Sequence, residues 1–353
     1  MTDSTEYTWP SILGAVSDGK DLTSQQAAWA MREIMSDSAT GAQIAAFGVA
    51  VKMKGAATEE LKGLADTMLA FANRIDLPGE ALDIVGTGGD RSHTVNISTM
   101  TSIVVAATGI PVIKHGNRAA SSKSGGADVL EALGVAISLG PDAVRECLND
   151  VGIGFCFAPV FHPAFRFTGP PRKEIGVPTV FNVLGPLTNP AAPPAGLIGC
   201  AFADLAPVLA QTFADRGNRV LLVRGDDGLD ELTTTTTSTV WQVVDGQVSE
   251  HGLDPRDLGI GLVKLSALQG GDAEYNAQVA RDLFAGATGP VRDAVVLNAA
   301  AAVVAFEQDR QFSDEELVAA LTDAKTRVEQ TIDSGAAAAL LKRWADESTR
   351  LAG

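Results

Sequence analysis

The residues most able to do chemistry lie in the stretch LDIVGTGGDRSHTVNIST, residues 82–99. An apolar run ends in three glycines, followed by an aspartate and small polar side chains. Glycines let a backbone turn tightly and approach a ligand without a Cβ in the way. Asn96 and Ser98 can cap a following helix, whose first N–H groups favour a phosphate. The stretch predicts an anion site, with a glycine-rich turn and ordinary capping as the alternative.

A second polar stretch, VIKHGNRAASSKSGGAD, ends at Asp128. Lys114, His115, Arg118 and Lys123 lie within ten residues of one another, between an expected strand and an expected helix. In a chain of net charge −16 such a basic cluster is unusual. It suits a polyphosphate ligand, and a solvated surface loop is the alternative.

A third stretch, RGDDGLDELTT, crowds Asp226, Asp227, Asp230 and Glu231 behind an apolar strand. Carboxylates this close repel one another unless they are solvated or bind a cation. Carboxylate oxygens suit Mg²⁺ that shares its shell with phosphates and water. Taken alone, the acidic turn leaves both interpretations open. With the other two stretches, it predicts a site for a phosphorylated ligand with a metal-bound diphosphate.

Regular elements are needed to bring these stretches together. Residues 1–77 show helical spacing of apolar residues, with Thr23 or Ser24 as an N-cap. From residue 81, apolar runs alternate with helical segments, which is typical of a mostly parallel sheet covered on both faces. We expect strands at 81–85, 110–114, 152–158, 195–202 and 219–225, and helices at 96–109, 126–134, 141–151 and 203–217.

The remaining segments depart from this alternation. Residues 157–196 hold many prolines and predict ordered loop with short helices. The run Thr233–Thr237 favours a β-branched strand, and Asp245-Gly246 favours a hairpin turn. Ser313 and Glu316 predict a capping box ahead of a C-terminal helix.

Bulk properties exclude several classes of protein. The 353 residues suggest about two domains. The acidic charge makes the chain a poor non-specific binder of nucleic acid or anionic membrane. No signal peptide or membrane-length apolar run is seen, and the three cysteines have no CxxC spacing. We expect buried free thiols in a cytoplasmic protein, with no nucleic-acid or membrane partner.

The ordered motifs resemble those of the anthranilate phosphoribosyltransferase family. GTGGD and NIST are followed by KHGNRAASS, FCFAPVFHPA, FNVLGPLTNP and DGLDE, in family order and at family spacing. The match runs from about residue 10 to the C-terminus. The resemblance implies transfer of phosphoribose from phosphoribosyl pyrophosphate to the amine of anthranilate, with release of diphosphate, in tryptophan biosynthesis. No side chain stands out as a catalytic acid or base, and a neutral arylamine requires none.

The resemblance also implies an architecture. It is a small all-helical domain, residues 1–80, which also recruits about 168–190, and a larger α/β domain, residues 81–353. The larger domain has a mostly parallel central sheet flanked by helices. A homodimer through the helical domain and Mg²⁺, as two ions per subunit, are further expectations.

Site residues carry over by position in the motifs. The donor, phosphoribosyl pyrophosphate, would contact Gly86, Gly89, Asp90, Thr94, Asn96, Ile97, Ser98, Thr99, Lys114, His115, Gly116, Asn117, Arg118, Ala119, Ala120, Ser121, Ser122 and Gly126. Anthranilate would meet Gly86, Asn117, His162 and Arg172, with Arg172 pairing its carboxylate. Ser98, Asp230 and Glu231 would hold the metal.

Three positions depart from the commonest family pattern. Arg91 replaces a Gly, Arg224 stands where a His is frequent, and Gly126 stands where a Ser is frequent. If the backbone at residue 91 needs a positive φ, Arg91 adds strain.

Two other functions share this architecture. One is a pyrimidine nucleoside phosphorylase-like enzyme, which need not carry the acidic pair. The other is a non-catalytic nucleic-acid-binding relative, which would be basic and lack the metal carboxylates. The charge of −16 and the intact Asp230-Glu231 pair count against the second.

Overall fold

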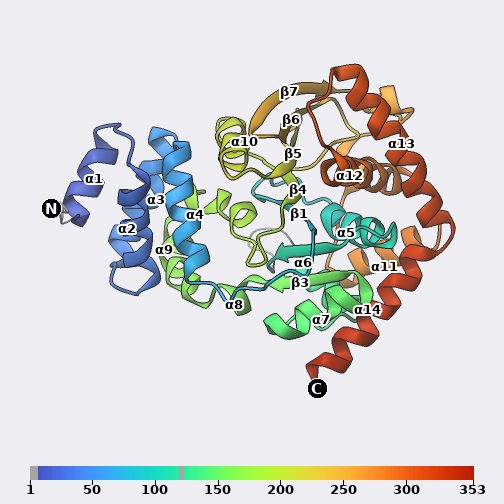
Figure 1. Ribbon diagram of the computed structural model, residues 1–353, viewed down its shortest axis with the longest axis horizontal. Coiled ribbons are helices and arrows are strands. Elements are labelled where there is room, and N and C mark those ends of the chain that lie inside the picture. The colour runs from blue at the N-terminus through green and yellow to red at the C-terminus, as the bar shows by residue number, and fades with distance from the viewer. Residues whose placement is uncertain (1–6, 119–122) are drawn as a thin grey trace.

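The computed structural model of the chain describes residues 7–118 and 123–353. A group of helices comes first and lies on one side of the molecule (Figure 1). Thr8, Thr23 and Thr40 each accept a hydrogen bond from a backbone N–H three residues on, which fixes where the first three helices begin. These helices are α1 (Trp9–Ser17), α2 (Ser24–Met35), α3 (Gly41–Lys54) and α4 (Thr58–Ala70).

One sheet occupies the centre of the other part of the molecule. Within the described residues it has seven strands in the order β3-β2-β1-β4-β5-β6-β7. The first five are parallel and the last two antiparallel, so the predicted mostly parallel sheet is confirmed. The strands are β1 (Leu82–Gly86), β2 (Val112–Gly116), β3 (Ile153–Phe157), β4 (Ala195–Gly199), β5 (Arg219–Gly225), β6 (Ser238–Val244) and β7 (Gln247–Leu253).

The predicted hairpin and capping box are both present. Asp245 and Gly246 have φ of 53° and 70°, as a tight turn between β6 and β7 requires. Ser313 accepts from the backbone of Glu316, whose side chain accepts from the N–H of Ser313 at 2.8 Å. The sequence pattern therefore located these two boundaries correctly.

Helices cover both faces of the sheet. Helices α5 and α12 lie on one face, while α10 lies on the other, next to α4 (Figure 1). Each face has its own apolar core: Ile84 and Leu197 belong to the first, Ile198 and Leu222 to the second, which also contains the interior of α1–α4. The helices of this part are α5 (Ile97–Ala107), α6 (Gly126–Ala132), α7 (Pro141–Val151), α10 (Ala206–Asp215), α11 (Ala273–Phe284), α12 (Pro290–Glu307), α13 (Asp314–Asp333) and α14 (Ala336–Ala352).

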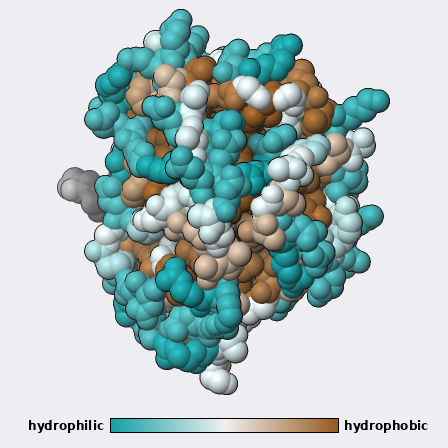
Figure 2. All heavy atoms as spheres, turned by 90° about the vertical axis from the view of Figure 1, so that its right-hand side faces the viewer, coloured by the Kyte–Doolittle hydropathy of each residue, from teal (hydrophilic) through white to brown (hydrophobic). Residues whose placement is uncertain are grey.

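Figure 2 shows the side of the molecule that bears α13 and α14, where hydrophilic residues alternate with smaller hydrophobic areas. Among the described residues, no helix is long and apolar enough to cross a membrane. Cys147, Cys156 and Cys200 are free and buried, as expected. Burial raises the pKa of the Cys200 thiol to about 12, so it is protonated and unreactive at neutral pH.

The proline-rich segment forms the short helices that were predicted for it. It returns from the sheet to pack against α3, where Pro171 lies beside Gly41 and the ring of Phe181 lies beside Gly48. Its elements are α8 (Ala158–Phe161), η1 (Pro163–Thr168), α9 (Gly169–Ile175), η2 (Val180–Val183) and η3 (Gly185–Leu187).

The strand predicted for Thr233–Thr237 is wrong. These residues form an irregular loop, and β6 begins only at Ser238. The hydroxyls of Thr233 and Thr235 donate to the carboxylate of Asp227, and that of Thr237 donates to Asp226. The hydroxyls thus override the β propensity of threonine, because they satisfy two carboxylates that would otherwise repel each other.

Two helical glycines, Gly63 in α4 and Gly14 in α1, allow a test of how closely α2 packs against α4. A Cβ on Gly63 would come 2.2 Å from the carbonyl oxygen of Ser24, whereas Gly14 in α1 is exposed with nothing within 4 Å of that position. Gly63→Ala should lower the free energy of unfolding by about 1–3 kcal/mol through overpacking. Gly14→Ala should raise it by about 0.5–1 kcal/mol through helix propensity. Denaturant titration of both variants checks this, and equal effects would contradict the packing argument.

Candidate active site

Three loops meet at the carboxyl ends of the parallel strands. The amide of Gly88, after β1, donates to Oδ2 of Asp230 at 2.7 Å, although the two residues are 142 apart in the chain. The amide of Ser98 donates to Oε1 of Glu231 at 3.0 Å. From β2, Nζ of Lys114 donates to Oγ of Ser98 at 3.2 Å. The structure therefore brings all three predicted metal ligands together, with one buried cation beside them.

Negative charge exceeds positive charge in this cluster. Burial raises the pKa of Asp230 to about 6, and the nearby Asp90 adds to the effect. Burial, Asp230 and Asp90 also raise the pKa of Glu231 well above its usual value. Lys114 is 4% exposed, and burial lowers its pKa against the attraction of the carboxylates. One ammonium group cannot balance these acids, so the donor set suits a divalent cation with a preference for oxygen ligands, such as Mg²⁺.

Two glycines leave the room that Asp230 needs. A Cβ on Gly86, the last residue of β1, would lie 2.1 Å from Oδ2 of Asp230. A Cβ on Gly199, the last residue of β4, would lie 1.6 Å from the carbonyl oxygen of Asp230. Any side chain at either position would push the acidic turn away from the sheet.

Behind the carboxylates lies a small cavity of about 10 Å³, between Ser98, Thr101, Gly199 and Glu231. This volume is enough for about one water molecule. The polar side chains around it therefore face a confined space rather than bulk solvent.

The loop after β1 adopts the left-handed conformation repeatedly. Gly88 and Gly89 have φ of 65° and 91°, and Arg91 and His93 have φ of 59° and 54°. Thr94 pairs with Gln269, and the amide of Gly270 donates to the carbonyl oxygen of His93 at 2.8 Å. A distant segment thus holds the loop in place. Asp90, which the loop carries, accepts a hydrogen bond from the Ser92 hydroxyl.

The start of α5 differs from the prediction. Asn96 is the N-cap residue, but its side chain makes no capping hydrogen bond. It donates instead to the carbonyl oxygen of Ser124 at 3.2 Å and accepts from Asn276 at 2.9 Å. Ile97 and Thr99 are buried, and Ser98 faces the acidic turn. Tertiary hydrogen bonds therefore replace the predicted cap.

Two positioning residues were not found from the sequence. Asn276 anchors Asn96 as described, and Asn298 exchanges two hydrogen bonds with the backbone of Leu232, at 3.0 Å and 2.9 Å. Asn298 thereby fixes the residue directly after Glu231. A lone asparagine inside the apolar run VVLNAAAAVV is the signal that could have indicated Asn298.

The side chains of the basic stretch, residues 112–128, do not all point in the same direction. Lys114 faces the acidic cluster, whereas the imidazole of His115 faces Gly185 O at 3.1 Å, on the side of the sheet that η3 covers. Arg118 pairs with Asp128 at 2.7 Å and with Glu131. Ala119, Ala120, Ser121 and Ser122 lie outside the described residues.

Three further residues predicted to contact the donor are Gly116, Asn117 and Gly126. Gly116 ends β2, and Asn117 follows it with an exposed side chain. Gly126 begins α6, where a Cβ would come 3.0 Å from Oγ1 of Thr99. A glycine at residue 126 therefore fits closely against α5, although a serine is frequent there in the family.

His115 and His162 lie side by side, with ring centroids 5.2 Å apart. Nε2 of His162 lies 2.8 Å from the carbonyl oxygen of Thr188, so this nitrogen carries the proton. Burial lowers the pKa of His115 to about 3 and that of His162 to about 4. Both rings are therefore neutral at neutral pH and tie the segment 185–188 to the sheet.

Arg172, on α9, is a half-buried positive charge in the chain's proline-rich segment. Its guanidinium lies over the ring of Phe165, 5.6 Å from the centroid, and burial lowers its pKa. Among the described residues its side chain makes no ion pair or hydrogen bond. A half-buried guanidinium without an acidic partner is suited to a carboxylate ligand.

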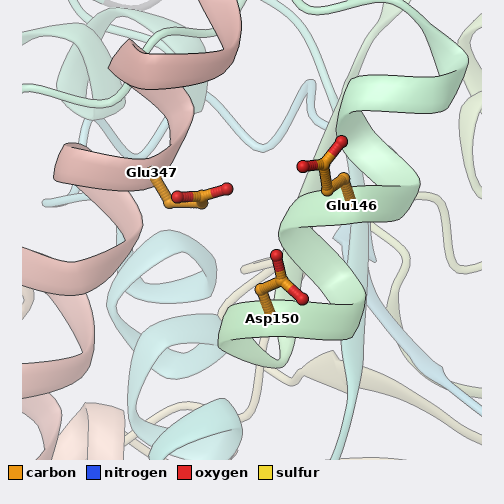
Figure 3. Close-up of side chains that lie close together, drawn as sticks. All are labelled: Glu146, Asp150 and Glu347. Atoms are coloured by element: carbon orange, nitrogen blue, oxygen red, sulfur yellow. The ribbon is translucent and has the colours of Figure 1, made fainter.

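A second acidic cluster lies between two helices outside the candidate site. Glu146 and Asp150 on α7 and Glu347 on α14 point toward one another (Figure 3). Arg350 pairs with Glu146 at 2.6 Å and with Glu347 at 2.5 Å. Glu146 and Asp150 are exposed and Glu347 is half-buried, and Arg350 neutralises part of their charge, so the cluster is an ion-paired helix contact.

Comparisons with known proteins agree on one family. Residues 10–72 match the glycosyl transferase family, helical bundle domain, and residues 78–338 match the glycosyl transferase family, a/b domain. The chain is 68% identical to the anthranilate phosphoribosyltransferase of Rhodococcus jostii (strain RHA1), over 98% of this chain and 94% of that protein.

Two solved structures are also similar. The enzyme of the same name from Thermus thermophilus has 37% identity and a TM-score of 0.88, covering 96% of this chain and 99% of that one. The one from Saccharomyces cerevisiae in complex with PRPP and Mg has 26% identity and a TM-score of 0.86, covering 98% and 99%.

Arg91 allows a test of strain in the glycine loop. A non-glycine residue in the left-handed region costs about 1–2 kcal/mol, and Arg91 makes no ion pair or hydrogen bond within the described residues that would offset it. Arg91→Gly should therefore raise the free energy of unfolding by about 1 kcal/mol. Lys62→Gly in α4 is the control, because it removes a basic side chain from a helix and should lower stability by about 1 kcal/mol. Chemical denaturation gives both values, and destabilisation by Arg91→Gly would show that its side chain has a stabilising partner.

Proposed function

Because the chain belongs to the anthranilate phosphoribosyltransferase family, we propose that it transfers phosphoribose from phosphoribosyl pyrophosphate to the amine of anthranilate. The products are N-(5-phosphoribosyl)anthranilate and diphosphate, and the reaction belongs to tryptophan biosynthesis. The observation that carries the proposal is the half-buried pair Asp230 and Glu231 beside Ser98 and Lys114. An acidic pair of this kind suits the metal of a diphosphate-bearing donor.

The donor binds over the glycine loop and the end of β2. Its residues are those predicted from the family motifs: Gly86, Gly89, Asp90, Thr94, Asn96–Thr99, Lys114–Ser122 and Gly126. Free backbone N–H groups of the glycine loop approach the phosphates, since no Cβ stands between them. Lys114, already directed at Ser98, supplies positive charge at short range.

Ser98, Asp230 and Glu231 hold Mg²⁺, with two ions per subunit. The two carboxylates each accept one amide hydrogen bond, from Gly88 and Ser98, and keep further oxygen lone pairs for metal ions. When bound, Mg²⁺ neutralises charge that develops on the departing diphosphate. The solved yeast relative is a complex with PRPP and Mg, which supports a donor that binds together with magnesium.

The acceptor site uses Gly86, Asn117, His162 and Arg172. Arg172 pairs with the anthranilate carboxylate and so fixes the direction in which the amine points. Among the described residues, Nδ1 of the neutral His162 imidazole has no hydrogen-bond partner, so its lone pair is left to accept a hydrogen bond. No residue needs to remove a proton from a neutral arylamine before attack, so catalysis rests on positioning and electrostatics.

The same proposal includes an architecture and a setting. Residues 1–80 form the helical domain, which recruits about 168–190, as the contact between Phe181 and Gly48 supports. The remaining residues, 81–353, form the α/β domain. We infer a homodimer through the helical domain, which is supported by the exposed Met53 on α3, and a cytoplasmic location, which is supported by the unpaired cysteines.

Replacing Arg172, the positive charge proposed to pair with anthranilate, should change the kinetics for anthranilate and not those for the donor. Arg172→Ala should raise KM for anthranilate about tenfold or more, because a hydrogen bond to a charged group contributes about 1.5–3 kcal/mol. KM for the donor should stay within about twofold. Loss of anthranilate fluorescence in the presence of donor and Mg²⁺ measures both constants. Arg166→Ala, in the same proline-rich segment, is the matched control, and unchanged acceptor kinetics in Arg172→Ala would refute the assignment.

Neutralising Asp230 and Glu231 should weaken the binding of both the metal and the donor. Asp230→Asn combined with Glu231→Gln should raise the Mg²⁺ concentration at half-maximal rate and KM for the donor, each by about tenfold or more. KM for anthranilate should change much less. Asp226→Asn, which removes an exposed acid from the same turn, should leave all three constants near wild type. An unaltered Mg²⁺ dependence in the double variant would place the metal elsewhere.

A further inference from the structure

Two lysines lie in the last turn of α3, and their charges have different surroundings. Nζ of Lys54 donates to Asp21 at 2.6 Å and to Glu60 at 3.0 Å, so acids of the first helices neutralise it. Nζ of Lys52 lies over the ring of Phe202, 5.4 Å from the centroid. Within residues 7–118 and 123–353 this ammonium forms no ion pair or hydrogen bond. The charge of Lys52 is therefore available to a ligand.

Phe202 follows β4 and lies directly against the glycine loop after β1. The amide of Ala201 donates to Oγ1 of Thr87 at 3.1 Å, which ties the two segments together. A Cβ on Gly89 would lie 3.1 Å from Cζ of Phe202, so Gly89 abuts the tip of the ring. Lys52 lies over the face of the same ring. A single aromatic ring thus separates a cation of α3 from the glycine loop.

The part of a bound donor nearest to Gly89 would be its diphosphate. The amide of Gly88, the preceding residue, donates to Oδ2 of Asp230 at 2.7 Å. The glycine loop and a proposed metal ligand therefore meet at this point, and the metal accompanies the diphosphate rather than the sugar. This step rests on the proposed function, from which it takes the donor and Mg²⁺.

We propose that Lys52 binds the diphosphate of the donor, with Nζ leaving the ring of Phe202 to donate a hydrogen bond to a phosphate oxygen. A cation over an aromatic ring is held weakly where both partners are half-buried, as they are here. A hydrogen bond from an ammonium to a phosphate is charge-assisted and stronger. The flexible four-carbon stem of lysine allows the exchange by side-chain rotation. The first helices would thereby supply positive charge where the departing diphosphate gains negative charge.

Stabilisation of the end of α3 does not account for this placement. Cations are favourable near the carboxyl end of a helix, where carbonyl oxygens lack partners. Lys54 already fills this role, because its Nζ donates to the carbonyl oxygen of Gly55 at 2.7 Å. The ammonium of Lys52 is directed instead toward the segment that follows β4.

Calorimetry with inorganic diphosphate and Mg²⁺ tests the contact without turnover. Lys52→Met should weaken binding about tenfold or more, because it removes the charge and keeps an unbranched side chain. Lys52→Arg should bind within about threefold of wild type, since a guanidinium also binds phosphate. Lys62→Met is the matched control, a half-buried lysine of α4, and should leave binding unchanged. Failure of the wild type to bind, or equal binding by Lys52→Met, overturns the proposal.

Steady-state kinetics separates a donor contact from a general structural defect. Lys52→Met should raise KM for the donor about tenfold or more and leave KM for anthranilate within about twofold. Lys52→Arg should restore most of the affinity for the donor. Equal changes in the two KM values of Lys52→Met, or a Lys52→Arg variant as impaired as Lys52→Met, overturns the proposal.

A crystal structure of the wild type with Mg²⁺ and diphosphate locates the ammonium directly. We expect Nζ of Lys52 within hydrogen-bond distance of a phosphate oxygen, and Nζ still over the ring of Phe202 overturns the proposal. The outcomes separate this contact from the function on which it rests. A wild type that transfers phosphoribose while Lys52→Met binds diphosphate normally refutes the contact alone. A wild type that needs Lys52 for diphosphate but transfers no phosphoribose supports the contact and refutes the function.

Discussion

The constraint on which the site depends is the close packing of the half-buried Asp230 and Glu231, beside which Lys114 is the buried cation found among the described residues. Like charges brought this close in a low-dielectric setting raise each other's pKa and destabilise the turn that carries them. The fold holds them with N–H donors from Gly88, in the glycine loop, and Ser98, in the first turn of α5. The acidic turn and the glycine loop therefore stabilise each other.

The order of the strands makes this meeting possible. Strands β1, β4 and β5 are neighbours and parallel, so the glycine loop and the acidic turn leave the sheet at the same edge. Gly86 and Gly199 end two of these strands without a side chain, where Asp230 occupies the space. Asn298 fixes the other end of the turn. These backbone, glycine and amide contacts together fix the positions of the two carboxylates.

Much of this was predictable because its signals are local. Glycine clusters, capping threonines and the Asp245-Gly246 turn act on their own neighbours, and the alternation of apolar runs defines a parallel sheet. The errors arise where distant partners intervene. The hydroxyls of Thr233, Thr235 and Thr237 bind Asp226 and Asp227, and no strand forms there. Asn96 binds Asn276 rather than capping its own helix.

The hydrogen bond from the Ser98 amide to Glu231 has a thermodynamic consequence. Glu231 already occupies the amino end of α5, where a phosphate would otherwise bind. An anion that takes this place must displace the carboxylate, and a cation that attracts Glu231 makes the displacement easier. The two ligands are therefore coupled through one side chain. By reciprocity, whatever factor the cation adds to the affinity of the anion, the anion adds to the affinity of the cation.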